Sequence, residues 1–226
     1  MQKIKFTDRT GLVPKEFYPS PQKNHMPIWI KKLNSYSGGG GFVPSGDGSG
    51  EQTAKRCVPM LDAVTTGYAL LLTEDILVER QDGFSFFKWP AGLGIDFHNA
   101  GQAGNPGGEP IPKWNNPFTI ETPKGYSTLF VPPLNEDSVF NIFSAVVDTD
   151  NYSGQINLPF KLVREDWAGI VPAGTPIAQI IPFKRDAWEM SVDSEPSQKS
   201  LRDERKIQSF FKDGYRKMFW SRKSYN

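Results

Sequence analysis

The sequence predicts an all-β core with an irregular N-terminal arm and a C-terminal amphipathic helix, and three observations predict it. First, the 226 residues include 21 glycines and 19 prolines, and 13% are aromatic, a composition typical of loop-rich β proteins rather than helix bundles. Second, apolar runs of strand length recur between residues 56 and 185. Third, turn signals such as Asp82-Gly83 and Ser153-Gly154 separate these runs.

Residues 1–55 are predicted to form the irregular arm. Four prolines between positions 14 and 27 interrupt regular structure, although residues 26–33 are expected to form a short helix with Pro27 at its first position. A run rich in glycine and serine follows over residues 35–50 and is typical of a flexible linker. The alternative, a phosphate-cradling loop, lacks the Gly-Lys-Ser/Thr end of a P-loop and no predicted strand precedes it.

Residues 56–185 are predicted to form the β core. A long connection at residues 100–113, with four glycines and three prolines, is typical of loops that are functional or contact a partner. The apolar runs that predict strands are residues 68–72, 85–87, 118–120, 127–131, 139–147, 156–163 and 177–182.

Residues 186–226 are predicted to form a basic, helical tail. From Lys199 onward there are nine basic and three acidic residues, and acids in the first turn favour a helix start near Leu201. Gly214 is expected to kink or end this helix. A basic amphipathic tail can dock on its own or a neighbouring subunit, bind another partner, or contact nucleic acid or membrane. One apolar stripe is predicted along it, formed by Ile207, Phe210, Phe211, Tyr215, Met218 and Phe219.

The charge and cysteine counts exclude several classes of function. With 26 basic and 25 acidic residues, the net charge of +1 gives no reason to expect nucleic-acid binding over the whole surface. A single cysteine, Cys57, excludes an internal disulfide and a cysteine-based zinc or iron–sulfur site, and we expect it to be a buried structural thiol. With only two histidines in the chain, a metal centre built from two or three histidines is not expected.

The N-terminal residues lack the apolar core of a signal peptide, and no stretch approaches 18 apolar residues. We therefore expect a soluble, cytoplasmic protein.

Two segments carry the most informative pattern. Residues 145–156 read Ala-Val-Val-Asp-Thr-Asp-Asn-Tyr-Ser-Gly-Gln-Ile, and residues 170–181 read Ile-Val-Pro-Ala-Gly-Thr-Pro-Ile-Ala-Gln-Ile-Ile. This pair resembles two motifs of the trimeric dUTPase and dCTP deaminase superfamily. Residues 122–126 also resemble the turn before that superfamily's Pro-Arg-Ser motif, and residues 61–70 resemble its first motif, Ala-Gly-Tyr-Asp-Leu. The resemblance covers about residues 60–185 in the same order and implies a β-clip fold, a distorted barrel or jelly roll.

The resemblance also implies roles for individual residues. Asp148 matches the catalytic aspartate, a general base that orients a water toward a phosphate, and Tyr152 matches the tyrosine that stacks on the nucleoside. Gln179 matches a glutamine beside the phosphate subsite, and Ser138 and Asn141 are further candidates for nucleotide binding. The alternatives are structural: a turn-capping carboxylate at Asp148, a packed strand-end aromatic at Tyr152 and a buried strand residue at Gln179.

The chain departs from the superfamily pattern at its phosphate-binding positions. One residue is inserted between Asp148 and Tyr152. Residues 132–138 stand in place of the Pro-Arg-Ser motif, where they lack the arginine and carry Glu136 and Asp137. Two acids facing a polyanion cost Coulomb energy unless a metal ion is present.

Further departures concern the metal and the remaining phosphate contacts. Ala69 stands where the first motif has its metal-supporting aspartate, and Pro176 stands where the fourth motif has an arginine. A basic helix, rather than a glycine-rich phosphate clamp, ends the chain. No glutamate can be assigned as the base that a dCTP deaminase would need.

A second resemblance concerns the origin of the chain. Residues 57–62, 114–118 and 219–225 are similar to a family found in tailed phages of cyanobacteria and in some bacteria. It implies a viral or bacterial source, with the protein in the host cytoplasm or the virion. It gives no information about activity.

Three functions follow as hypotheses. The first is a diverged, non-catalytic dUTPase-fold protein with a structural or interaction role, which a phage could encode. It is expected to be a homotrimer, because in that superfamily sheets pack around a threefold axis and strands or tails are exchanged, with the final helix as the exchanged element. The second is a nucleotide pyrophosphatase that uses Asp148 and Mg²⁺. The third is a sensor of a nucleotide or another small ligand without turnover.

Overall fold

The computed structural model describes residues 2–37, 52–89, 95–98, 111–164, 166–195, 197–209 and 213–226, with only the backbone for 95–98. Most of the glycine-rich run and of the 100–113 connection lies outside these residues, as do Phe210 and Phe211. The chain divides into two compact units. The β unit comprises Met1–His25, Gly67–Arg185 and Tyr225–Asn226, and the helical unit comprises Met26–Thr66 and Asp186–Ser224. The division into an arm (1–55), a core (56–185) and a tail (186–226) stays a prediction.

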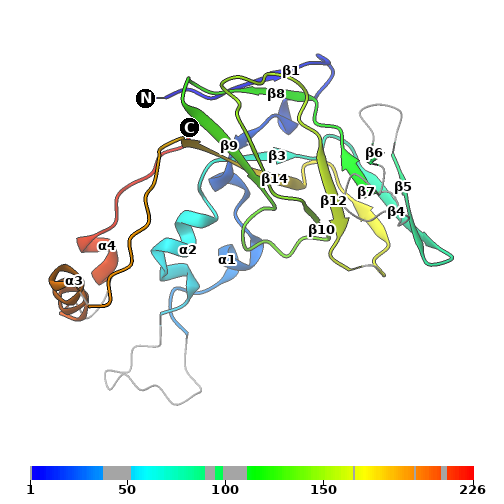
Figure 1. The fold of residues 1–226 in the computed structure, drawn as a ribbon. Helices are drawn as coiled ribbons and strands as arrows, with labels where there is room; N and C mark the ends of the chain where they lie inside the picture. The colour runs from blue at the N-terminus through cyan, green and yellow to red at the C-terminus, as the bar shows by residue number, and fades with distance from the viewer. Residues whose placement is uncertain are drawn as a thin grey trace. The chain divides into compact units, whose positions relative to one another are not determined.

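The described strands of the β unit form four antiparallel sheets. Figure 1 shows how these strands are arranged. The five-stranded sheet has the order β11 (Ala145–Val147), β9 (Tyr126–Val131), β14 (Pro176–Lys184), β3 (Tyr68–Leu71) and β2 (Ser20–Pro21). The four-stranded sheet has the order β10 (Phe140–Ile142), β12 (Leu158–Leu162), β7 (Ile111–Trp114) and β6 (Ile95–His98). The smaller sheets are β13 (Gly169–Val171), β4 (Ile76–Gln81) and β5 (Phe84–Lys88), and the pair β1 (Lys5–Asp8) and β8 (Phe118–Glu121).

The helical unit contains the α-helices, all of them short. They are α1 (Ile28–Lys32), α2 (Val58–Ala63), α3 (Gln198–Gln208) and α4 (Gly214–Met218), with the 3-10 helix η3 (Ala54–Arg56) before α2. Two further 3-10 helices, η1 (Lys15–Phe17) and η2 (Gln22–His25), belong to the β unit. The prediction of an all-β core with a C-terminal helix is confirmed, and the strands that the structure describes form open sheets rather than a closed barrel.

The core of the β unit contains an aromatic cluster in the four-stranded sheet. Trp114 of β7 stacks on Phe160 of β12 with ring centroids 4.2 Å apart, and Phe140 of β10 meets both rings edge-on. Offset stacks and edge-to-face contacts are the favoured aromatic geometries. In the five-stranded sheet, Ala178 and Ile180 of β14 are fully buried in the same cluster.

The three-stranded sheet has one buried and one exposed face. Ile76, Val78 and Val171 point into the core. Strand alternation places Phe84, Phe86 and Ile170 on the opposite face, where they are 50%, 47% and 62% exposed. The predicted Asp82-Gly83 turn joins β4 to β5, and both residues have the positive φ that a two-residue hairpin loop needs.

Several segments differ from their predicted form. The apolar run at 139–147 is two strands in two different sheets, because β10 pairs with β12 whereas β11 pairs with β9. The tail helix is interrupted close to Gly214, as predicted: α3 ends at Gln208, and α4 begins at Gly214 after Asp213, whose φ is +63°. The prediction of a buried thiol is wrong, since Cys57 is exposed at the start of α2. None of the helices in the described ranges has the length and apolar character needed to cross a membrane.

Gly67 is required at its position because the backbone of β14 passes directly over it. Its φ is +74°, and a Cβ built there would lie 2.1 Å from the carbonyl oxygen of Ile180. We expect Gly67→Ala to lower the free energy of unfolding by about 2 kcal/mol or more, as measured by urea denaturation. Gly83→Ala is the matched control: its φ is +86° but nothing lies within 4 Å of a Cβ there, so about 1 kcal/mol is expected. Equal losses in the two variants would contradict the close approach.

Candidate functional site

The turn that carries Asp148 is anchored by the buried hydroxyl next to it. β11 pairs with β9, with Val147 opposite Thr128, and the chain then turns over Asp148–Asn151. Thr149 is buried, and its Oγ1 lies 2.7 Å from the Oγ1 atoms of both Thr122 and Thr128. This hydroxyl cluster holds the middle of the turn inside the protein, so the carboxylates on either side of it are placed precisely by the sheet.

Asp150 is the buried carboxylate of the turn, because its side chain is only 1% exposed. Arg185 donates to both of its oxygens, with Nη1 2.8 Å from Oδ1, and the backbone N–H of Gly125 donates to Oδ2 at 2.8 Å. The hydrogen bonds from Arg185 hold the pKa of Asp150 at about 2, below its ordinary value of 3.8. The same pairing raises the pKa of Arg185.

Asp148 is the exposed carboxylate of the turn, with 59% of its side chain accessible. Its Oδ1 accepts a hydrogen bond from Ser127 Oγ at 2.6 Å and lies 3.2 Å from Arg185 Nη1. Arg185 Nη1 also donates to Ser127 Oγ at 3.1 Å. One guanidinium thus bridges both carboxylates of the turn, and the cluster of Asp148, Asp150 and Arg185 has a net charge of −1.

Sequence reasoning missed Arg185 and Ser127. Arg185 directly follows β14, and its role depends on strand register: Lys184 pairs with Tyr126, so the next residue comes opposite Gly125. The backbone N–H of Arg185 donates to the Gly125 carbonyl at 2.9 Å. A basic residue at the end of an apolar strand is a weak signal in a sequence, and only the pairing of β14 with β9 makes it specific.

The other sequence-predicted site residues lie in separate local settings. Tyr152 is 49% exposed, its hydroxyl donates to the carbonyl of Gln155 at 3.0 Å, and its ring lies against Gly154. Gln179 is fully buried on β14, and its Oε1 accepts from the backbone N–H of Leu134 at 3.0 Å. Ser138 is half-buried before β10. Asn141 lies on β10 opposite Lys161, in the four-stranded sheet rather than the sheet of Gln179.

The positions that the resemblance assigns to a metal do not supply ligands. Ala69, in place of the metal-supporting aspartate, is fully buried on β3 and offers only a methyl group. In the described part of the chain, no three His, Cys, Asp or Glu side chains gather as a group that could hold a metal ion. The residues present therefore do not fit Mg²⁺ at that position.

No family model and no curated protein matches the chain. Among solved structures, it is similar to phage dUTPases at low identity. A point mutant of the Staphylococcus bacteriophage 80alpha dUTPase with dUpNHpp is 11% identical and has a TM-score of 0.34, over 87% of this chain and 90% of that one. Another mutant of the same dUTPase with dUpNHpp is also 11% identical, with a TM-score of 0.36 over 87% and 99%.

A mutant dUTPase from phage phi11 of S. aureus, studied for the coordination of a structural Mg(II) ion, is 12% identical. Its TM-score is 0.32 over 57% of this chain and 84% of that one. All three TM-scores lie below 0.5, so these likenesses do not establish an activity for this chain.

The ion pair of Asp150 with Arg185 makes the free energy of unfolding depend on pH below about pH 4. Because the pKa of Asp150 is lower in the folded protein than its ordinary value, its contribution is present above pH 4 and is lost as pH falls toward about 2. We expect Asp150→Asn to lower the urea midpoint at pH 7 and to flatten its fall between pH 4 and about pH 2. Asp166→Asn, at a carboxylate that is 79% exposed, is the control and should leave the pH profile as in the wild type. An unchanged slope in Asp150→Asn would refute the role of this pair.

Proposed function

We propose that this chain is a non-catalytic, dUTPase-like protein that acts as a homo-oligomer in a structural or interaction role. The resemblance of its motifs to the dUTPase superfamily supports the fold assignment, and the resemblance of residues 57–62, 114–118 and 219–225 supports an origin in a tailed phage. The setting of Asp148 is the observation that carries the non-catalytic part of the proposal.

Arg185 is the cation beside Asp148, and two carboxylates already share it. A triphosphate approaching this turn would meet a cluster of net charge −1. Residues 132–138, which follow the other end of β9, carry Glu136 and Asp137 where the superfamily has an arginine. Phosphoryl chemistry depends on cations or metal ions that neutralise the phosphate oxygens. In this chain the nearby cation stabilises the turn instead.

Tyr152 and Gln179 support the same conclusion. The hydroxyl of Tyr152 donates to the carbonyl of Gln155 and its ring lies against Gly154, so one face of the ring is already covered by its own segment. The amide oxygen of Gln179 satisfies the backbone N–H of Leu134 in a fully buried position. Losing that bond would leave a buried polar group unpaired, so the structure itself requires this glutamine.

One observation favours the hydrolase as the second candidate. Asp148 is more than half exposed, so water can reach its carboxylate as a general base requires. In that case Mg²⁺ would have to be held without the superfamily's metal-supporting aspartate, by groups other than Ala69.

The oligomeric part of the proposal is supported by the outer face of the three-stranded sheet. Phe84 and Phe86 of β5 lie on that face, each about half exposed, and Ile170 of β13 lies on the same face across β4. Exposed apolar patches of this kind mark interaction surfaces. A homotrimer, as the superfamily resemblance implies, would cover this face in each subunit.

The absence of catalysis can be tested with a panel of deoxynucleoside triphosphates and Mg²⁺. We expect the wild type and Asp148→Asn to release pyrophosphate at the same rate as buffer alone, while an authentic dUTPase run in parallel is active. Turnover by the wild type that disappears in Asp148→Asn would overturn the proposal in favour of the hydrolase.

The oligomer can be tested by size-exclusion chromatography with light scattering. We expect the wild type to have three times the chain mass of 25.4 kDa. Replacing Phe84 and Phe86 together by lysine should shift the protein to the monomer, because charged groups would lose hydration in the interface. Leu12→Lys, at an 82% exposed position in the same unit, is the control and should leave the mass unchanged. A monomeric wild type would refute the assembly.

A further inference from the structure

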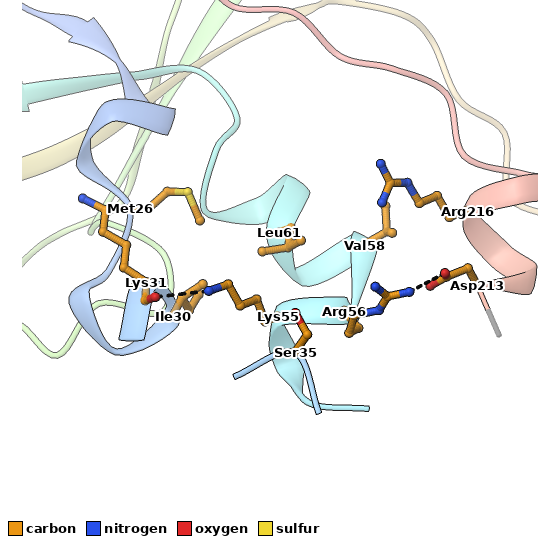
Figure 2. A pocket seen from close by; sticks show the side chains of 10 residues that line it. All are labelled: Met26, Ile30, Lys31, Ser35, Lys55, Arg56, Val58, Leu61, Asp213 and Arg216. Carbon is orange, nitrogen blue, oxygen red and sulfur yellow. Dashed lines mark hydrogen bonds and ion pairs between the residues drawn. The ribbon is translucent and has the colours of Figure 1, made fainter. Parts of the chain in front are cut away.

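The helical unit contains a pocket that neither the motifs nor the proposed function accounts for (Figure 2). Its volume is about 460 Å³, within the range of small-molecule sites. Residues of α1, η3, α2 and α4 line it, so segments about 150 residues apart in the sequence meet there. All lie within one compact unit.

Cations dominate the polar part of the lining. Lys31 comes from α1, Lys55 and Arg56 come from η3, and Arg216 comes from α4. Lys55 Nζ donates to the backbone carbonyl of Lys31 at 3.2 Å, which satisfies the end of α1 but leaves the charge uncompensated. In the described part of the chain, Lys31, Lys55 and Arg216 form no ion pair with a carboxylate.

Among the described residues, Arg56 is the one lining cation with an acidic partner, Asp213 at the start of α4. Asp213 is also the one carboxylate among the described residues that line the pocket. The Nε–H of Arg56 is buried and has no hydrogen-bond partner. Because this atom is covered, the terminal N–H groups of Arg56, one of which binds Asp213, are the donors that it offers to an anion in the pocket.

The remaining lining is apolar and comes from the helices. Ile30 of α1 is fully buried, and Val58 and Leu61 of α2 are half-buried at the pocket surface. A cation-lined pocket with an apolar wall suits a ligand that has an anionic group at one end and an apolar body at the other. Three cations without carboxylate partners favour a dianion over a single carboxylate.

We propose that this pocket binds a small organic phosphate, with the phosphate among Lys55, Arg56 and Arg216 and the apolar body against Val58 and Leu61. The pocket is open to solvent on one side, and its volume of about 460 Å³ fits a small molecule rather than a nucleic-acid strand or a lipid surface. The site is separate from the Asp148 turn and does not depend on whether that turn is catalytic.

Isothermal titration calorimetry with three probes tests both halves of the proposal. Phenyl phosphate carries the phosphate and an apolar ring, inorganic phosphate lacks the ring, and phenol lacks the phosphate. We expect one phenyl phosphate per chain, bound about tenfold more tightly than inorganic phosphate because the ring buries apolar area, and no heat of binding with phenol. Affinity should fall as salt is raised, because screening weakens charge interactions. Equal binding of phenol and phenyl phosphate would overturn the proposal.

Substitutions locate the binding. Replacing Lys55 and Arg216 together by glutamine should weaken phenyl phosphate binding by about tenfold or more. The matched control replaces Lys199 and Arg202 of α3 by glutamine; this removes the same charge outside the pocket and should leave binding unchanged. Melting temperatures would confirm that both proteins are folded. Loss of binding in the α3 variant alone, or in neither, would place the anion elsewhere and refute the site.

Asp213→Asn provides a test in the opposite direction. Asparagine tolerates the left-handed φ of +63° at this position, so the start of α4 should be kept. The substitution removes the carboxylate that competes for Arg56, and we expect phenyl phosphate to bind several-fold more tightly. Weaker binding in a folded Asp213→Asn protein would contradict the role assigned to Arg56.

Discussion

The β unit depends on the pairing of β14 with the strands on both of its sides. β14 pairs with β9 from Gln179 to Lys184 and with β3 from Pro176 to Ile180. Its middle residues are fully buried, so a slip of one residue would turn the apolar side chains away from the core. The close approach of Gly67 to Ile180 fixes the same alignment from the β3 side.

The register of β14 also decides what the Asp148 turn can do. It delivers Arg185 to the start of β9, where the guanidinium binds the Tyr126 carbonyl, Ser127 and both carboxylates of the turn. Exposed ion pairs contribute little to stability, but the Asp150 pair is bidentate and its carboxylate is almost fully covered. The turn resembles a catalytic motif, but its two carboxylates bind Arg185 at the end of β14 and so connect the turn to that strand. This contact needs no substrate.

The local elements were easier to predict from the sequence than their partners. Apolar runs located β9, β12 and β14, and Asp82-Gly83 marked a hairpin, because these signals arise within a few residues. Lys5–Asp8 carries no such signal and forms a strand only because β8 pairs with it. The site shows the same limit. The motif identifies Asp148, whereas Arg185 and Ser127 reach it through pairing between distant segments. The pocket of the helical unit likewise combines residues 26–61 with Asp213 and Arg216, which lie far apart in the sequence.

The two units use their cations in different ways, although the whole chain is nearly neutral. In the β unit, Arg185 is shared by Asp148 and Asp150, and Lys5 and Lys88 pair with Glu121 and Glu79. In the helical unit, three of the four cations that line the pocket have no carboxylate partner among the described residues. A cation already paired with a carboxylate offers an incoming anion little, because the anion must compete with the existing partner. An unpaired cation beside an apolar wall gains from an anionic ligand. The charge pattern therefore favours anion recognition in the helical unit and an architectural role for the Asp148 turn.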